Sequence, residues 1–302
     1  MNDALPIRFD PAGLAAINAI IAVMMFGAAL ELRLDDFRRV ARRPAGLLAG
    51  FTAQALLTPA ATCLVTILFG VEPVLALGMM LVAACPSGAL SNVLTWRARG
   101  TVALSVALTT LSSLAATVLT PLNFALYAGL NPATRALLQS IGIPAGGILA
   151  QTALVLGLPI VVGMLVGARA PRVAARVQGP LRTLSAVARL AFIAGAFREN
   201  RGLYVARFDD FFWLVVGQNA MALAIGALVA RVARLPEADR RAVTIEVGIH
   251  NSALGLVILV TFFPAAGSMM LITAFWGVWH LVSGLALSAW WGRRPPMDPA
   301  VP

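Results

Sequence analysis

Residues 244–258 read TIEVGIHNSALGLVI, and they interrupt an apolar run that is otherwise long enough to cross a membrane. The middle of this run carries Glu246, His250 and Asn251. A carboxylate near the middle of a bilayer costs about 3 kcal/mol or more unless other groups compensate its charge. The stretch therefore predicts a functional site at Glu246, and a bound cation would supply the compensation.

The composition predicts an all-α polytopic membrane protein. The 302 residues are 60% hydrophobic and only 12% charged, and the mean hydropathy is +0.86. Such a chain is too apolar for a soluble globular domain, and helices are the usual way to satisfy backbone polar groups in lipid. We therefore expect most of the chain to lie within the lipid bilayer.

The net charge of +10 has a simple explanation in membrane topology. All 23 basic residues are arginines, and they gather in short segments between apolar runs. This is the positive-inside pattern, so we expect no nucleic-acid partner. The two cysteines, Cys63 and Cys85, lie apart, and their spacing predicts neither a disulfide nor a metal cluster.

Nine apolar spans can be placed along the chain. They cover about 12–32, 44–68, 72–98, 101–130, 142–168, 182–198, 208–231, 238–263 and 267–292. The sixth is the least apolar because it contains Arg189, which either snorkels to the interface or contacts an anionic substrate. We expect the first span to be an uncleaved helix, because the residues before it lack a basic signal-peptide region.

The arginines predict the orientation. With the N-terminus outside, most arginines fall in cytoplasmic segments: Arg33, Arg38, Arg39, Arg42, Arg43, Arg97, Arg99, Arg169, Arg172, Arg176, Arg182, Arg231, Arg234, Arg240, Arg241, Arg293 and Arg294. The outer side receives Arg8, Arg135, Arg198, Arg201 and Arg207. We therefore expect a multi-pass protein of the cell (inner) membrane with a cytoplasmic C-terminal tail at 293–302.

The third and eighth spans are apolar at their ends and polar in the middle. The third reads VAACPSGALSNVLTWRARG over residues 82–100, where Pro86 removes a backbone donor and Gly88 weakens the helix. Asn92 and Asn251 are candidate caps for the second half of each broken helix. Two interrupted helices at corresponding places in two halves are typical of inverted-repeat transporters, in which the freed backbone groups line a cavity or bind a solute.

Oxygen-bearing side chains accompany Glu246. Ser91 and Asn92 lie at the break of the third span, and Ser105 and Thr109 share one face of the fourth. Each alone is equally consistent with helix packing, but together with Glu246 they form a plausible five-oxygen cage for sodium.

Three further polar residues lie inside apolar spans. Gln54 and His280 are candidates for either hydrogen bonds between helices or a binding site. His250 follows Glu246 by four residues, so the two would face each other if the helix continued that far.

Two stretches resemble the bile acid:sodium symporter family: PSGALSNVLTWRARGTVALSVALTTLSS at 86–113 and IEVGIHNSALGLVI at 245–258. MFGAALELRLDDFRRV at 25–40, QALLTP at 54–59 and VWH at 278–280 are similar to that family too. The resemblance implies a core domain with two crossing broken helices beside a panel domain. Residues 44–130 and 208–292 would form the core, and residues 12–32 and 142–200 the panel. Many members have ten helices, so nine spans would correspond to a chain without the first.

The resemblance also implies two sodium sites. The first would use Ser91, Asn92, Ser105, Thr109 and Glu246. The second would use Gln54, Glu246, the backbone carbonyls of Val247 and Ile249, and a glutamine that here is His250. An imidazole is a poorer sodium ligand than an amide oxygen, so this second site is altered or accepts a proton instead. Asn92, Asn251 and His280 are the expected substrate contacts.

We expect a secondary transporter that couples a sodium gradient to symport of a small organic anion by alternating access. A proton-coupled carrier of the same fold, using His250 with Glu246, is the alternative. Bile acid, pantoate-like acids and 2-oxo acids all suit such a family. No HExxH or GxSxG motif occurs, so we expect neither an enzyme nor a cofactor beyond the coupling ion, and no obligate protein partner is indicated.

Overall fold

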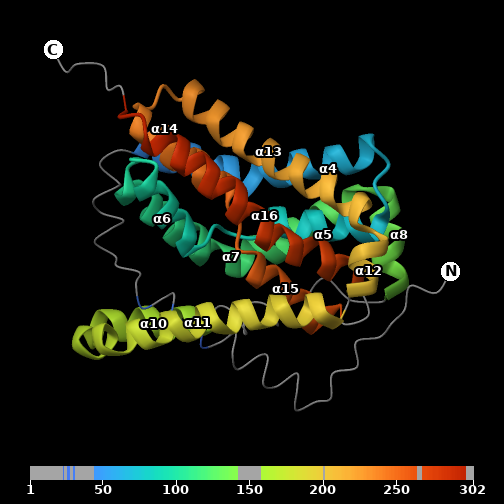
Figure 1. Cartoon of the computed structure of the whole chain (residues 1–302), viewed down its shortest axis with the longest axis horizontal. Helices are drawn as coiled ribbons and strands as arrows, with labels where there is room; N and C mark the ends of the chain where they lie inside the picture. The colour runs from blue at the N-terminus through green and yellow to red at the C-terminus, as the bar shows by residue number, and fades with distance from the viewer. Residues whose placement is uncertain are drawn as a thin grey trace.

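The computed structural model describes residues 44–141, 158–199, 201–263 and 267–296, together with Val23, Phe26, Gly27 and Leu30. Every element in these ranges is helical, and they pack into one helical assembly (Figure 1). Most residues of the expected first and fifth spans lie outside the described residues. The expectation of nine spans and of an inverted repeat is therefore not tested by the described elements.

Four helical segments of the described residues are long and apolar enough to cross a membrane. The first is Pro44–Leu68, in which α3 (Pro44–Thr52), the π-helical turn η1 (Ala53–Leu57) and α4 (Thr58–Leu68) follow one another without a loop. The others are α7 (Val102–Leu130), α13 (Phe208–Val232) and α16 (Gly267–Gly292). Their bounds agree with the expected second, fourth, seventh and ninth spans.

The third and eighth expected spans are each divided into two helices. The third consists of α5 (Pro73–Ala84) and α6 (Ala89–Arg97), and the eighth of α14 (Glu237–Gly248) and α15 (Ser252–Phe262). The two breaks lie against each other: Asn251 N donates to Pro86 O at 2.7 Å, and Ser87 and His250 form an isolated antiparallel bridge. The four helix ends therefore meet at one place inside the protein.

The remaining helices are α8 (Pro132–Ile141), α10 (Leu158–Arg169), α11 (Pro171–Glu199) and α12 (Arg201–Ala206). The expected sixth span, about 182–198, is only the second part of α11. The helix begins at Pro171, where a proline is accommodated in a first turn. Figure 1 shows α10 and α11 along one edge of the molecule and α13 along the opposite edge.

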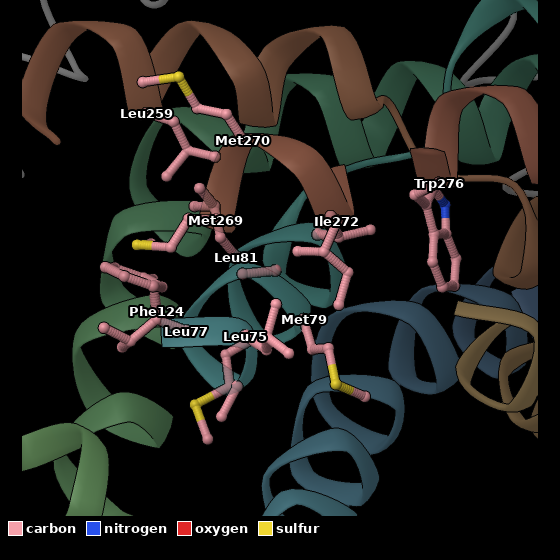
Figure 2. Packing of buried hydrophobic residues seen from close by; sticks show 14 of the residues in the cluster. Leu75, Leu77, Met79, Leu81, Phe124, Leu259, Met269, Met270, Ile272 and Trp276 are labelled. Atoms are coloured by element: carbon pink, nitrogen blue, oxygen red, sulfur yellow. The ribbon is translucent and has the colours of Figure 1, made fainter. Parts of the chain in front are cut away.

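The main hydrophobic core surrounds α5. Ten of its residues, Leu75 to Ala84, are buried, so this helix is apolar on every side. Its side chains pack with those of α7, α15 and α16, as Figure 2 shows for Leu77, Leu81, Phe124 and Met269. This packing fixes the end of α5, and with it the break that follows.

Arg241 is a correction to the loop assignments. The sequence places it in a cytoplasmic loop, but it lies inside α14 and is 2% exposed. Its guanidinium donates to the backbone carbonyls of Ala98, Trp291 and Arg294 at 2.9–3.1 Å and pairs with Glu237. An arginine can be buried when its charge is paired and its donors are used. These bonds tie the start of α14 to the ends of α6 and α16.

Candidate functional site

Glu246 lies in the last turn of α14 and is 0% exposed. Its Oε1 accepts hydrogen bonds from the hydroxyls of Ser91 at 2.5 Å and Thr109 at 3.0 Å, and a further one from Ser105. Its Oε2 accepts from Ser87 and, at 3.0 Å, from Thr109. Every one of these partners is a neutral hydroxyl, so the bonds satisfy the carboxylate oxygens and leave the charge uncompensated.

Three separate elements bring the hydroxyls together. Ser105 and Thr109 stand one turn apart on α7 and present the same face to α14. Ser91 belongs to the first turn of α6, and Ser87 belongs to the extended break between α5 and α6. The break therefore contributes directly to the site, because it lets a residue outside the helical pattern reach Glu246.

Asn92 joins the same cluster, although not as a cap. Its Oδ1 accepts hydrogen bonds from Ser105 Oγ at 2.8 Å and Thr109 Oγ1 at 3.2 Å. The N-cap position of α6 is Gly88, with no side-chain cap, so the expectation that Asn92 caps α6 is wrong. Asn92 comes four residues after that position, and its side chain points across to α7 instead of back to the helix start.

Asn251 does cap its helix, as its sequence position predicts. Its side chain accepts a hydrogen bond from Leu254 N at 3.2 Å at the start of α15.

The structure thus brings together all five residues of the first expected cage. Serine and threonine hydroxyls offer lone pairs when their own protons point elsewhere, an amide oxygen always offers lone pairs, and one carboxylate supplies a full negative charge. Oxygen ligands of this kind suit a hard monovalent or divalent cation. The arrangement can exchange its hydroxyl-to-carboxylate hydrogen bonds for bonds from the same oxygens to a cation.

Gln54 lies in η1, the π-helical turn, and is 3% exposed. Neither its amide oxygen nor its amide nitrogen has a hydrogen-bond partner among the described residues. It borders a small cavity of about 20 Å³ together with Pro86, Ser112 and Asn123. That volume is enough for one water-sized species, and single π-helical turns often occur at functional sites.

His250 occupies the break between α14 and α15. It is buried, its two ring nitrogens have no hydrogen-bond partner in the described part of the chain, and its ring lies edge-on to Trp276 at 5.6 Å. The helix ends at Gly248, so the condition for His250 to face Glu246 across one helical turn is not met. The imidazole is buried next to an aromatic ring with its hydrogen-bonding capacity unused.

The remaining predicted site residues, Val247, Ile249 and His280, are also buried. Val247 and Ile249 are buried at the end of α14. His280 is buried in α16, one turn after Trp276, and so shares a helix face with the residue that packs on His250.

Polar side chains also satisfy carbonyls freed where helices break or bulge. Asn219 Nδ2 donates to Gly248 O at 2.8 Å, Thr120 Oγ1 to Ala84 O at 2.8 Å, and Asn123 Nδ2 to Ala55 O at 2.7 Å. These donors and Ser87 were not among the site residues predicted from the sequence. For Ser87 a signal existed, because it stands between Pro86 and Gly88 in the predicted break. For Asn219 and Asn123 the only signal was an amide inside an apolar span.

A buried carboxylate among oxygen ligands, at the junction of two interrupted helices in a helical membrane protein, is typical of secondary transporters. Comparison with known proteins supports that class. Residues 19–207 match the model of the Sodium Bile acid symporter family. The chain belongs to this family, and it is a multi-pass membrane transporter, not an enzyme.

Several relatives carry names that describe sodium-coupled transporters. It is 28% identical over 278 residues to the uncharacterized sodium-dependent transporter YocS of Bacillus subtilis (strain 168), covering 92% of this chain and 83% of the relative. It is 30% identical over 281 residues to the probable sodium/metabolite cotransporter BASS1, chloroplastic, of Oryza sativa subsp. japonica, covering 92% of this chain and 66% of the relative. It is 26% identical over 253 residues to the human ileal sodium/bile acid cotransporter, covering 82% and 70%.

Proposed function

We propose that this protein carries a small organic anion across the membrane in symport with sodium, by alternating access. One observation carries the proposal: the carboxylate of Glu246 is buried at the junction of α5, α6, α14 and α15, and its bonded neighbours are oxygen atoms of neutral groups. A charge buried in this way needs a counter-charge, and a bound sodium ion supplies one.

Sodium at the first site would be held by Ser91, Asn92, Ser105, Thr109 and Glu246. These oxygens already lie within hydrogen-bond distance of one another, so little reorganisation is needed to turn them towards an ion. Because they come from α6, α7 and α14, an ion bound among them would hold these three helices together. This links ion occupancy to the arrangement of the interrupted helices.

The second site would use Gln54, Glu246, the carbonyls of Val247 and Ile249, and His250. The unpartnered amide of Gln54 and the small cavity beside it support a second ligand position. His250 favours the alternative in which a proton takes the place of a second sodium, because its unpartnered imidazole can bind a proton more readily than a sodium ion. In the fully proton-coupled alternative, protons at both His250 and Glu246 would replace sodium, and a pH gradient without sodium would drive transport.

The anion would bind near the first turns of α6 and α15. Both helices begin at the junction, and helix N-termini attract negative charge. Asn92, Asn251 and His280 are the proposed contacts. Asn92 would serve both ion and anion, which would couple the two occupancies through one side chain.

The mechanism needs two bodies that move against each other. We assign residues 44–130 and 208–292 to the core that holds the ions, and residues 12–32 and 142–200 to a panel. We further propose nine crossings related by an inverted repeat, in the cell membrane, with the N-terminus outside and the C-terminus in the cytoplasm. All the proposed ion ligands lie within residues 44–130 and 208–292, around the buried junction of the interrupted helices, which supports this division.

The test is uptake into proteoliposomes, screened over bile, pantoate-like and 2-oxo acids, with and without a sodium gradient. We expect a sodium gradient to drive accumulation and Glu246→Ala to abolish it. Asp209→Asn is the matched control, because it also removes a carboxylate but at an exposed position. Undiminished sodium-driven uptake by Glu246→Ala would refute the coupling role, and uptake driven only by a pH gradient would favour the proton-coupled alternative.

A further inference from the structure

A second cavity lies away from the ion ligands, between α4, α5 and α13. Its volume is about 820 Å³, which falls in the range of small-molecule sites. Its lining is mainly apolar and shares no residue with the oxygen cluster: Val65, Phe69, Val71, Glu72, Leu75, Met79, Arg207, Asp210, Trp213, Leu214, Gly217, Gln218 and Met221. We call this cavity the α4–α13 groove. Figure 1 shows α13 at the edge of the molecule opposite α11.

The length of the groove matches one leaflet of a bilayer. Its lining on α13 extends from Asp210 to Met221, which is about 16 Å of helix at 1.5 Å per residue. Half of the hydrocarbon thickness of a bilayer is about 15 Å. Phe69 and Trp213 are 77% and 68% exposed beside it, and tryptophan is enriched where a membrane meets water. A straight acyl chain therefore fits the groove along its length.

Charged side chains occupy only one end of the groove. Arg207 pairs with Glu72 and, at 3.1 Å, with Asp210. Two carboxylates against one guanidinium leave this end with a net negative charge among the lining residues. A headgroup with a net negative charge would be repelled here, whereas the primary ammonium of a zwitterionic headgroup could donate hydrogen bonds to the carboxylates. The quaternary ammonium of choline has no proton to donate.

Away from the charged end, the groove is lined by Met79, Gln218 and Met221. Gln218 Nε2 donates to Met79 O at 2.9 Å and to Thr62 Oγ1 at 3.2 Å, which holds the amide against α4 and α5. The charged end and this uncharged end define a direction, with a headgroup beside Arg207 and an acyl chain running towards Met221.

We propose that the α4–α13 groove binds one phospholipid, with a phosphoethanolamine headgroup at Glu72 and Asp210 and one acyl chain along α13. The lipid belongs to the leaflet on the side of the turn between α4 and α5. Its phosphate lies beside Arg207, whose guanidinium is within reach of both carboxylates. The site is separate from the transport cycle's ion ligands, so lipid binding and sodium binding are independently measurable.

Gly217 provides a sharp test. A Cβ built at this position meets nothing within 4 Å, so a side chain there can begin in the groove without a clash at its first atom. Gly217→Leu fills part of the groove and also removes an unfavourable helical glycine, so the variant should fold. Gly129→Leu on α7 is the matched control, because its added Cβ also meets nothing within 4 Å and it does not line the groove.

The experiment is native mass spectrometry of the purified full chain after exchange into vesicles of equal phosphatidylethanolamine, phosphatidylcholine and phosphatidylglycerol. We expect one retained phosphatidylethanolamine in the wild type and in Gly129→Leu. Gly217→Leu should lower the retained fraction roughly tenfold, because the chain loses contact over about two methylene groups. Glu72→Gln should remove the preference for phosphatidylethanolamine over phosphatidylcholine.

Three results would overturn the proposal. They are retention of phosphatidylglycerol in preference to the other lipids, equal retention by wild type and Gly217→Leu, and absence of any bound lipid from a wild-type protein that is monodisperse and folded.

Discussion

Thr109 is the residue of the oxygen cluster whose removal gives the most interpretable result. Its hydroxyl lies 3.0 Å from both oxygens of Glu246 and 3.2 Å from Asn92 Oδ1. Thr109→Val keeps the shape and the β-branched side chain but removes the hydroxyl. The variant therefore deletes one proposed sodium ligand and leaves the helix and its packing nearly unchanged.

The size of the effect follows from the kind of bond that is lost. A hydrogen bond or dipole contact to a charged group contributes about 1.5–3 kcal/mol. Loss of that contribution from the sodium complex corresponds to an increase of roughly 10- to 150-fold in the sodium concentration that gives half-maximal uptake. Thr109→Ser retains the hydroxyl, so we expect it to stay within about threefold of the wild type.

The neighbouring residue supplies the control. Thr110 is also buried on α7, but its hydroxyl donates to Val106 O at 2.7 Å within its own helix. Thr110→Val removes an equivalent atom without touching Glu246, and we expect sodium dependence to be unchanged. The assay is sodium-dependent uptake in proteoliposomes, with the sodium-induced rise in melting temperature as a second readout. A wild-type sodium response in Thr109→Val, or an equal loss in Thr110→Val, would refute the reasoning.

Three further predictions test the junction and its packing. Replacement of His250 by glutamine supplies an amide oxygen to the second site, so we expect more charge to be carried per transport cycle in current measurements on proteoliposomes. An unchanged charge would show that the imidazole is not what keeps sodium from the second site. Asn219→Leu leaves the carbonyl of Gly248 unpaired and should destabilise the protein by about 1–3 kcal/mol in thermal unfolding, whereas wild-type stability would show that this bond is dispensable. Gly78→Ala places a Cβ in steric overlap with Ile272 Cγ2 and should destabilise the protein by about 1–3 kcal/mol in the same assay; a neutral result would mean that α5 and α16 can separate locally.

Much of the described fold could be predicted because a long apolar span in a lipid bilayer forms an α-helix that satisfies its own backbone hydrogen bonds. The bounds of α7, α13 and α16 follow from where apolar runs begin and end. The break after α5 also follows from local chemistry, because Pro86 cannot donate to a helix and Gly88 adopts an extended conformation. The sequence of α11 was harder to interpret, because its first turns are polar and its helix continues through Pro180.

The candidate site was predictable in its members but not in its geometry. Ser91, Ser105, Thr109 and Glu246 could be grouped because helical spacing and one buried carboxylate point to the same chemistry. The role of Ser87 could not be predicted, because it depends on how an irregular segment folds back against α14. The direction of the Asn92 side chain depends on how α6 packs against α7, and the burial of Arg241 depends on contacts between segments far apart in sequence.

The most direct measurement is equilibrium binding of radioactive sodium to the purified protein, because it needs no knowledge of the transported anion. The wild type and the exposed-site control Asp209→Asn should bind sodium saturably. Glu246→Gln removes the charge and one acceptor oxygen at nearly the same size, and it should lose that binding. At a sodium concentration of 100 times its dissociation constant, the free energy of unfolding of the wild type should rise by about 2.7 kcal/mol. This rise should be absent from Glu246→Gln. Saturable binding by Glu246→Gln with wild-type affinity would contradict the account.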